Sequence, residues 1–281
     1  MPAKIFACIS HKGGTGRTTT AANVAYRLAL RNRSVCCVDL DLDSPTFGAV
    51  VGIKGLEQGA KIGVHDFLHL PVEVDPRPPE LAGDAVVDIW QRTDLPRPGV
   101  GRAGRLRLLP GGRERLGQPL ASSAAQGRIL AQILADLRDD YEHLLLDVRS
   151  GASDTVEAVL AADDHLQSIH WLVFYRWTHQ HLSGAADLCE RLSGAGARLG
   201  LVRTAFTDPS EMASWFKEQN RALSARARET LSGWEMITDI PVEPMLQWRE
   251  GIVTDDDLRD GVANEAIVAS YDDLATRLEA L

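Results

Sequence analysis

A glycine-rich stretch near the N-terminus constrains the fold of this chain more than any other feature. It runs Ser-His-Lys-Gly-Gly-Thr-Gly-Arg-Thr-Thr-Thr over residues 10–20, directly after an apolar run at Lys4–Ser10. A helical pattern of small and apolar residues follows it, over Thr18–Leu30. A strand, a glycine loop and a helix in this order form a cradle in which backbone N–H groups bind phosphate. The stretch therefore predicts a phosphate-binding loop.

The rest of the chain alternates short apolar runs with longer helical segments. We expect further strands at Ser34–Leu40, Arg105–Leu109, His143–Val148, Ser168–Tyr175, Arg198–Phe206 and Trp234–Ile240. We expect further helices at Ser123–Asp139, Asp154–Ala162, His179–Leu192, Pro209–Leu231 and Ala263–Leu281. Such alternation indicates an α/β fold, with a doubly wound, mainly parallel sheet that carries helices on both faces. A length of 281 residues suits one domain over 1–281.

The region 71–104 interrupts this alternation. It is rich in proline and glycine, and we expect only a short strand within it, at Val86–Trp90. We interpret it as an irregular insertion in the domain. Two hypotheses for it remain open: a surface loop without a role, and a segment that binds a partner.

Composition excludes several classes of protein. The net charge of −9 does not favour nucleic acid or an anionic membrane as a partner, although a local basic patch is compatible with it. The four cysteines lack CxxC spacing, so we expect no zinc or iron–sulfur site, and we interpret Cys36 and Cys37 as reduced core residues. Without a signal peptide or a long apolar run, the sequence predicts a cytoplasmic protein.

Most positions of the glycine loop have an expected contact with a nucleotide. Its glycines let the backbone turn tightly and approach phosphate oxygens. The Thr18 hydroxyl has the position of a Mg²⁺ ligand, and Thr19 that of a donor to the α-phosphate. The residues of this stretch that we expect to bind the nucleotide are Gly13, Gly14, Thr15, Gly16, Arg17, Thr18 and Thr19.

The segment Lys12-Gly-Gly-x-Gly resembles the deviant Walker A motif of the MinD/ParA family of P-loop ATPases, of the SIMIBI class. The resemblance implies that ATP is the ligand and that Lys12 reaches across a nucleotide-dependent homodimer to the phosphates of the partner. Arg17 stands where the family has lysine. Two interpretations of this departure are open: arginine takes over the binding of phosphate, or nucleotide still binds while hydrolysis is slow or lost.

Alternating aspartates follow the second predicted strand. Asp39, Asp41 and Asp43 lie on one side of an extended segment, at the carboxyl end of a strand, where α/β sheets bind ligands. Neighbouring carboxylates repel one another, so we favour a role linked to Mg²⁺. The pair Asp39-Leu-Asp41 also resembles switch I of the MinD/ParA family, which implies that Asp41 orients or polarises the attacking water.

The apolar run that ends in Asp147 resembles the Walker B strand of this family, and Asp147-Val-Arg-Ser-Gly151 resembles its switch II. The resemblance implies that Asp147 holds Mg²⁺ through water. The metal ligands expected on these grounds are Thr18, Asp41 and Asp147. The residues expected to take part in catalysis are Lys12, Arg17 and Asp41.

Late in the chain, Ile240-Pro-Val-Glu-Pro244 resembles the family loop that lies against adenine. The resemblance implies that Pro241 and Val242 pack on the base, with Glu243 as the acidic residue of the loop. Arg203 stands where the family often supplies an asparagine to the base, so the choice between ATP and GTP stays open although the family points to ATP.

The resemblance thus implies a Mg-ATP-binding protein, with slow ATPase activity, whose ATP-dependent dimerisation controls recruitment of an unidentified protein partner or intracellular positioning. A non-hydrolysing regulatory or scaffold protein is the alternative. We interpret the acidic C-terminal helix as a packing helix and not a membrane anchor. Nonspecific DNA binding through Arg221, Arg226 and Arg228 is possible but not favoured. The aromatic and histidine cluster at 171–181 indicates either packing or recognition of a partner.

Overall fold

Eight strands pair into a single sheet within the part of the chain that the computed structural model describes, residues 3–42, 44–53, 63–68, 85–97, 103–112, 123–151, 153–207 and 214–281. The strands are β1 (Lys4–Ser10), β2 (Val35–Leu40), β3 (Val87–Asp88), β4 (Leu106–Leu109), β5 (His143–Val148), β6 (Ile169–Arg176), β7 (Arg198–Phe206) and β8 (Glu235–Pro241). Their order is β3-β4-β2-β5-β1-β6-β7-β8, and only the β3–β4 pairing is antiparallel. The predicted α/β class is confirmed.

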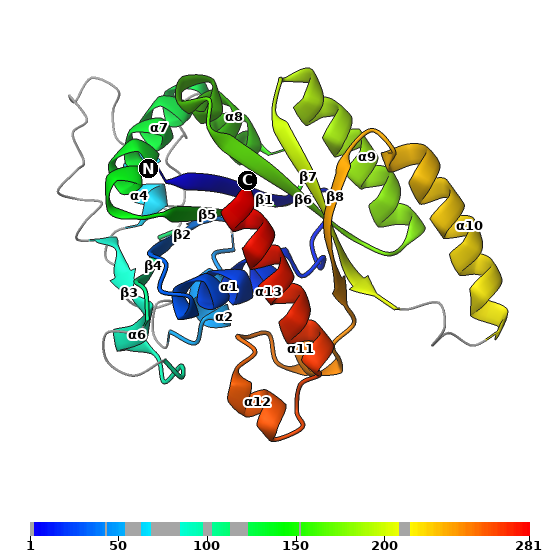
Figure 1. Ribbon diagram of the computed structural model, residues 1–281. Coiled ribbons are helices and arrows are strands. Elements are labelled where there is room, and N and C mark those ends of the chain that lie inside the picture. The colour runs from blue at the N-terminus through cyan, green and yellow to red at the C-terminus, as the bar shows by residue number, and fades with distance from the viewer. Residues whose placement is uncertain are drawn as a thin grey trace.

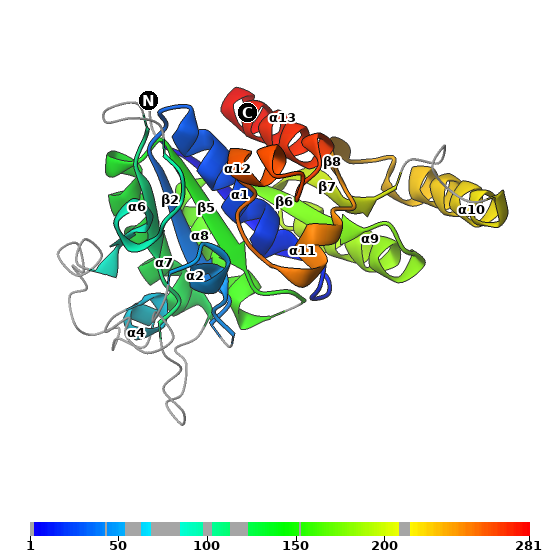
Figure 2. The same cartoon turned by 90° about the horizontal axis from the view of Figure 1, so that it is seen from below.

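Helices cover both faces of this sheet (Figures 1 and 2). The longer helices are α1 (Arg17–Leu30), α7 (Ser123–Asp140), α8 (Asp154–Leu166), α9 (His179–Gly194), α10 (Ser214–Leu231) and α13 (Glu265–Ala280). The short ones are α2 (Phe47–Val50), α4 (Val64–Leu68), α6 (Ile89–Arg92), α11 (Pro244–Trp248) and α12 (Asp255–Arg259). Two apolar cores result, one beneath α7, α8 and α9 and the other beneath α1 and α13.

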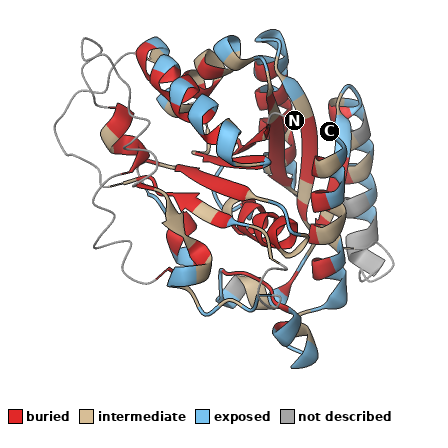
Figure 3. Ribbon diagram, turned by 60° about the vertical axis from the view of Figure 1, so that its left-hand side comes forward, coloured by how far each residue is buried: buried red, intermediate tan, exposed pale blue. Residues whose placement is uncertain are grey.

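The central strands are buried on both sides, as Figure 3 shows. Every residue of β2 and of β5 is buried, which explains why both read as continuous apolar runs. Cys36 and Cys37 lie inside β2 with no measurable exposure, and burial raises the pKa of Cys36 to about 12. Both thiols are therefore neutral packing groups at ordinary pH, as the sequence predicted.

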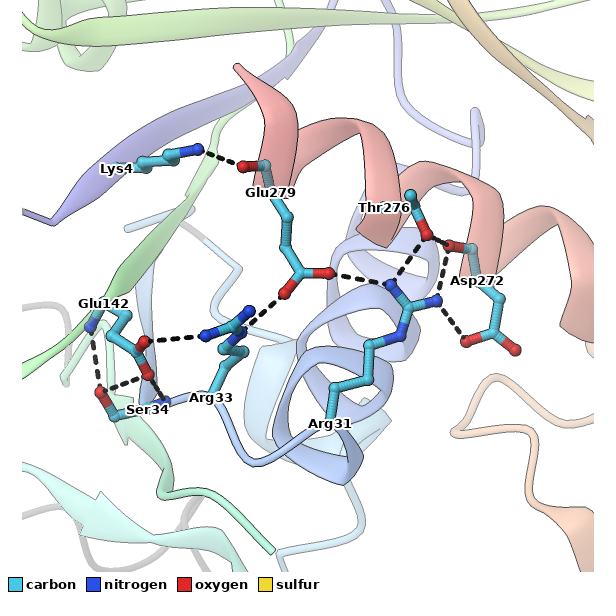
Figure 4. A network of polar contacts seen from close by, with 8 residues as sticks. All are labelled: Lys4, Arg31, Arg33, Ser34, Glu142, Asp272, Thr276 and Glu279. Atoms are coloured by element: carbon cyan, nitrogen blue, oxygen red, sulfur yellow. Dashed lines mark hydrogen bonds and ion pairs between the residues drawn. The ribbon is translucent and has the colours of Figure 1, made fainter.

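The C-terminal helix α13 is fixed to the body of the domain by a polar network (Figure 4). Arg31 donates to Glu279 at 3.1 Å and to Asp272 at 2.9 Å, and Arg33 donates to Glu279 at 2.6 Å. The Lys4 ammonium donates to the Glu279 carbonyl. Together with the buried apolar face of α13, this network supports the interpretation of a packing helix. None of the described helices combines the length and apolar character needed to cross a membrane.

Two expectations about elements differ from the structure. The strand expected over Val86–Trp90 is limited to Val87–Asp88, because the Asp88 carboxylate accepts the Gln91 N–H at 3.2 Å and starts the helix α6. The helix expected from Pro209 is described from Ser214 onward. Residues 208–213, Asp43, and the parts 71–84 and 98–102 of the expected insertion lie outside the described residues.

Candidate functional site

The glycine loop connects β1, in the middle of the sheet, to the first turn of α1. Gly14 and Gly16 both have a φ of 75°, a left-handed conformation that a residue with Cβ adopts only with strain. Gly16 also precedes α1 directly, so the positive end of the helix faces the inside of the loop. This backbone has the left-handed turns and the helix start that the predicted phosphate cradle requires.

Hydrogen bonds from distant parts of the chain hold the loop in place. Thr204, on β7, donates its hydroxyl to the Thr15 carbonyl at 2.6 Å. The Gly151 N–H donates to the Ser10 carbonyl at 2.9 Å and thereby joins the segment after β5 to the loop. The loop is therefore held at its start by the segment after β5 and at Thr15 by β7.

A cavity of about 460 Å³ opens beside the loop at the carboxyl edge of the sheet. The predicted nucleotide-binding residues that line it are Gly14, Thr15, Gly16, Thr19, Pro241, Val242 and Glu243. Thr20, Arg176, Thr204, Ala205 and Tyr271 line it as well. Two segments more than 200 residues apart in the sequence, the loop and the residues after β8, thus form one binding-sized cavity.

The predicted metal ligands converge on the side of the loop that faces β2 and β5. The register of these strands places Asp39 opposite Asp147. Thr18 donates its hydroxyl to Asp147 Oδ2 at 2.8 Å. Asp41 follows two residues after Asp39, at the end of β2.

The guanidinium of Arg17 lies among these three side chains. Its Nε donates to Asp147 Oδ1 at 2.5 Å, and its Nη2 lies 3.4 Å from both Asp41 Oδ2 and the Thr18 hydroxyl. Arg17 is 7% exposed and Asp147 is completely buried. The guanidinium of Arg17 thus places a positive charge between the carboxylates of Asp41 and Asp147.

Burial and ion pairing act in opposite directions on this pair. Burial lowers the pKa of Arg17, but the charge of Asp147 and the hydrogen bond to it raise the pKa above its ordinary value. Burial raises the pKa of Asp147, and the positive charge of Arg17 opposes that rise. Removal of either partner would leave a buried charge without compensation.

Asp39 organises the segment that follows β2. Its two carboxylate oxygens accept the N–H groups of Asp41, at 3.1 Å, and Phe47, at 3.2 Å. Burial, followed by the nearby charge of Asp147, raises its pKa well above the ordinary range. Asp39 thus positions the backbone that carries Asp41.

Arg203 does not lie where the sequence placed it. Its guanidinium forms two hydrogen bonds with Asp239, at 2.7 and 2.6 Å, and stacks on Trp177 and Phe206. It lines a different cavity, of about 580 Å³, beneath α10. Successive residues of a strand face opposite sides of the sheet, so Thr204 and not Arg203 faces the loop. This geometry does not support a contact between Arg203 and the base.

Glu243 lies at the edge of the loop cavity, but both of its carboxylate oxygens are engaged. One accepts the Met245 N–H at 3.2 Å as the cap of α11, and the other accepts the Asn264 N–H at 2.9 Å. Its buried position therefore shapes the segment around Pro241 and Val242 and fixes the start of α13.

Lys12 is exposed and does not line the cavity of its own chain.

The cluster at 171–181 divides into two groups. Trp171 and Tyr175 are buried core residues of β6. His181, in the first turn of α9, lies close to the backbone of Gly13, and the His11 ring packs against Gly184 of the same helix. The described residues contain no group of three or more His, Cys, Asp or Glu side chains that could hold a metal ion. His181 and the first turns of α9 thus pack against the phosphate loop.

Three residues that the sequence did not identify help to build the site. Asn23, on α1, accepts the Val253 N–H at 2.7 Å and donates to the Gly251 carbonyl at 3.0 Å. Thr204 holds the loop, and Tyr271, on α13, contacts Thr20. Each is a polar residue in a largely apolar segment, and only the fold shows which hydrogen-bond partner it has.

The arginines considered for DNA binding lie on α10. Arg221 and Arg226 are exposed, and the Arg228 side chain lies outside the described residues.

Comparisons with known proteins agree with this geometry. The family model described as the CobQ/CobB/MinD/ParA nucleotide binding domain matches residues 6–204. An uncharacterised protein of Pseudomonas putida is 28% identical over 216 residues, which cover 74% of this chain and 71% of that protein.

Two solved structures share the fold. In the MinC:MinD cell division protein complex of Aquifex aeolicus, the matching chain has a TM-score of 0.68 and 18% identity, over 99% of this chain and 96% of that one. The septum site-determining protein MinD of Pyrococcus horikoshii, complexed with Mg-ADP, has a TM-score of 0.66 and 18% identity over the same shares of the two chains. At these identities the likeness concerns the fold.

Proposed function

Because the chain belongs to the CobQ/CobB/MinD/ParA nucleotide-binding domain family, we propose that it is an ATP-dependent switch that binds a partner as a nucleotide-bound dimer and hydrolyses ATP slowly. The observation that carries the proposal is the convergence of Thr18, Asp41 and Asp147 beside a preformed phosphate loop. A phosphate cradle bordered by two carboxylates and a hydroxyl is the arrangement that binds and cleaves a triphosphate.

Binding of the nucleotide begins with the loop backbone and the first turn of α1, which offer N–H groups to the phosphates. The phosphates compete with Asp147 and Asp41 for the guanidinium of Arg17, which binds both kinds of oxyanion well. In this proposal Arg17 turns from the carboxylates toward the phosphates when the nucleotide enters.

The oxygen donors on this side of the loop fit Mg²⁺, the ion that the family implies. A hydroxyl and two carboxylates are hard ligands of the type that Mg²⁺ prefers, and Thr18 and Asp147 already lie within hydrogen-bond distance of each other. Thr18, Asp41 and Asp147 would hold the ion once Arg17 has moved away. When bound there, Mg²⁺ neutralises charge on the phosphates.

Hydrolysis in this proposal depends on Asp41. Asp41 is partly exposed, is bound to the end of β2 through Asp39, and lies on the side of the loop where the terminal phosphate would emerge. An aspartate at this place can orient a water molecule for attack in line with the leaving group. Hydrolysis is slow in this proposal because Arg17 has to leave its ion pairs with Asp41 and Asp147 before Asp41 can act.

Dimerisation in this proposal brings Lys12 to the phosphates of a second copy. The exposed position of Lys12 at the rim of the loop, away from the cavity of its own chain, supports this role. The dimer would then present a surface to an unidentified protein partner, and the similar MinD of Aquifex aeolicus is found in a complex with MinC.

The test measures binding, assembly and turnover separately. Binding of a fluorescent ATP analogue with Mg²⁺ should be saturable and should be reversed by ATP. Sedimentation with a slowly hydrolysed ATP analogue should detect a dimer that Lys12→Ala abolishes without loss of binding. Phosphate release should stop in Asp41→Ala, while Asp260→Ala, in an exposed turn, serves as the matched control.

Each outcome decides one part of the proposal. No binding to a folded sample would refute it as a whole. Binding and dimerisation without phosphate release would establish the alternative, a non-hydrolysing regulatory protein. Unchanged turnover in Asp41→Ala would remove Asp41 from the chemistry.

A further inference from the structure

Arg176 ends β6, the strand next to β1, and its side chain lines the cavity beside the phosphate loop. The neighbours of Arg176 in that lining include Gly14, Thr15 and Gly16, the tightest part of the loop. The side chain is half-buried, so it is already positioned within the site and does not extend freely into solvent.

No carboxylate forms an ion pair with Arg176 among the residues that the structure describes. Its Nη1 donates to the Gly14 carbonyl at 3.5 Å, which is longer than an ordinary N–H···O hydrogen bond of about 2.7–3.2 Å and therefore weak. Other arginines around the site are held by carboxylates, Arg17 by Asp147 and Asp41, and Arg203 by Asp239. Arg176 therefore keeps most of its donors available to a ligand.

The charged residues near Arg176 include Lys12 and two carboxylates, Glu243 and Glu250, that line the same cavity. Glu243 accepts two backbone N–H groups, and neither glutamate forms an ion pair with Arg176 among the described residues. Burial lowers the pKa of His181, and the charges of Arg176 and Lys12 lower it further, against the opposing effect of the Gly13 backbone. Lys12, Arg176 and His181 thus lie near one another along the side of the loop that faces α9. Arg176 and Lys12 are the cations of this group, and two cations on one side of the loop favour the approach of an anion.

We propose that Arg176 is a phosphate-binding residue that contacts the diphosphate portion common to ADP and ATP. This inference rests on the proposed nucleotide binding and adds a ligand that the loop motif does not contain. Arg176 lies beside the middle of the loop, whereas Arg17 lies beside the metal ligands, so the two guanidinium groups approach the phosphates from opposite sides. The planar fork of donors suits two oxygens of one phosphate or of adjacent phosphates.

The experiment compares wild type, Arg176→Gln and Arg176→Lys in competition binding with ATP, ADP, AMP and inorganic pyrophosphate. Loss of a charge-assisted hydrogen bond predicts affinities for ATP, ADP and pyrophosphate that are about 10- to 100-fold lower in Arg176→Gln. AMP should lose less, and Arg176→Lys should recover part of the loss. Arg198→Gln, an exposed arginine at the opposite end of the neighbouring strand β7, is the matched control and should bind normally.

Salt dependence separates a ligand from a structural contact. A direct contact with phosphate predicts that the affinity of Arg176→Gln for pyrophosphate falls less steeply with added salt than that of wild type. The inference is overturned by affinities within about twofold of wild type, or by a loss that leaves the salt dependence unchanged. Failure of wild type to bind any nucleotide would instead refute the proposed function.

Discussion

Arg17 Nε lies 2.5 Å from Asp147 Oδ1, so the arginine that begins α1 forms an ion pair with the carboxylate at the end of β5. The same guanidinium also reaches Asp41 at 3.4 Å. The sequence predicted that the carboxylates at this edge of the sheet need a cation. The guanidinium of Arg17 is such a cation, and the proposed nucleotide would compete with the carboxylates for it.

The first prediction concerns removal of this internal cation. Arg17→Ala leaves Asp147 buried without its partner, and we expect the free energy of unfolding to fall by about 3–5 kcal/mol. Arg17→Lys keeps the charge and should lose less. Chemical denaturation without nucleotide measures both. Added Mg²⁺ should then restore part of the stability of Arg17→Ala, because the ion binds the carboxylates of the folded state only.

Arg27→Ala provides the control for the Mg²⁺ effect. Arg27 is also buried and forms an ion pair at 3.0 Å, but its partner Asp255 is exposed and lies apart from the carboxylate cluster. We expect this variant to be destabilised and Mg²⁺ not to restore it. Equal restoration of both variants would show that Mg²⁺ stabilises the protein nonspecifically.

The second prediction separates Arg203 from nucleotide binding. Arg203→Gln breaks two hydrogen bonds to Asp239 and should lower the free energy of unfolding by about 1 kcal/mol, since both groups are partly exposed. The affinity for ATP should stay within about twofold of wild type. A large loss of affinity, measured under conditions in which the variant is fully folded, would show that Arg203 does contribute to binding of the base.

The third prediction tests the contact between α9 and the loop. A Cβ at Gly184 would lie 2.2 Å from Cδ2 and 2.4 Å from Cγ of His11, so Gly184→Ala must displace the His11 ring, near the start of the loop. We expect about a 10-fold loss of nucleotide affinity, or about 1.4 kcal/mol. Gly194→Ala, in the same helix with open space around the added methyl, should bind as wild type. Equal affinities in the two variants would show that His11 does not position the loop.

The fourth prediction concerns acid stability. His143 is buried at the start of β5, and both of its ring nitrogens lack a hydrogen-bond partner. Burial lowers its pKa below the ordinary value of 6.5. Below about pH 6.5 the unfolded chain therefore binds a proton that the folded chain excludes, so stability falls as the pH falls.

His143→Leu should reduce this slope and raise the free energy of unfolding by about 1 kcal/mol near pH 6. Denaturation at several pH values measures both effects. Part of the slope should remain, because burial also lowers the pKa of His170 and His181. An unchanged slope would show that His143 does not contribute to it.

Much of the fold and part of the site follow from local patterns in the sequence. Seven of the eight predicted strands appear within one residue of their expected ends, because buried parallel strands are mostly apolar along their length. The loop glycines were identifiable because a phosphate cradle needs left-handed backbone at fixed positions, and Gly14 and Gly16 have it. Asp41, Asp147 and Thr18 were identifiable because strand ends and the helix start after the loop place them at one edge of the sheet.

Only the tertiary structure decided which partner each charged side chain meets. Arg17 begins α1, Arg176 ends β6 and Arg203 lies within β7. Arg17 binds two carboxylates, Arg203 faces away from the loop, and Arg176 faces the cavity without an ion pair among the described residues. The repeat of apolar residues along a helix or strand indicates on which face of that element a side chain lies. The partner depends on strand order and on the side-chain conformation that burial and charge select, and these arise only when distant segments pack together.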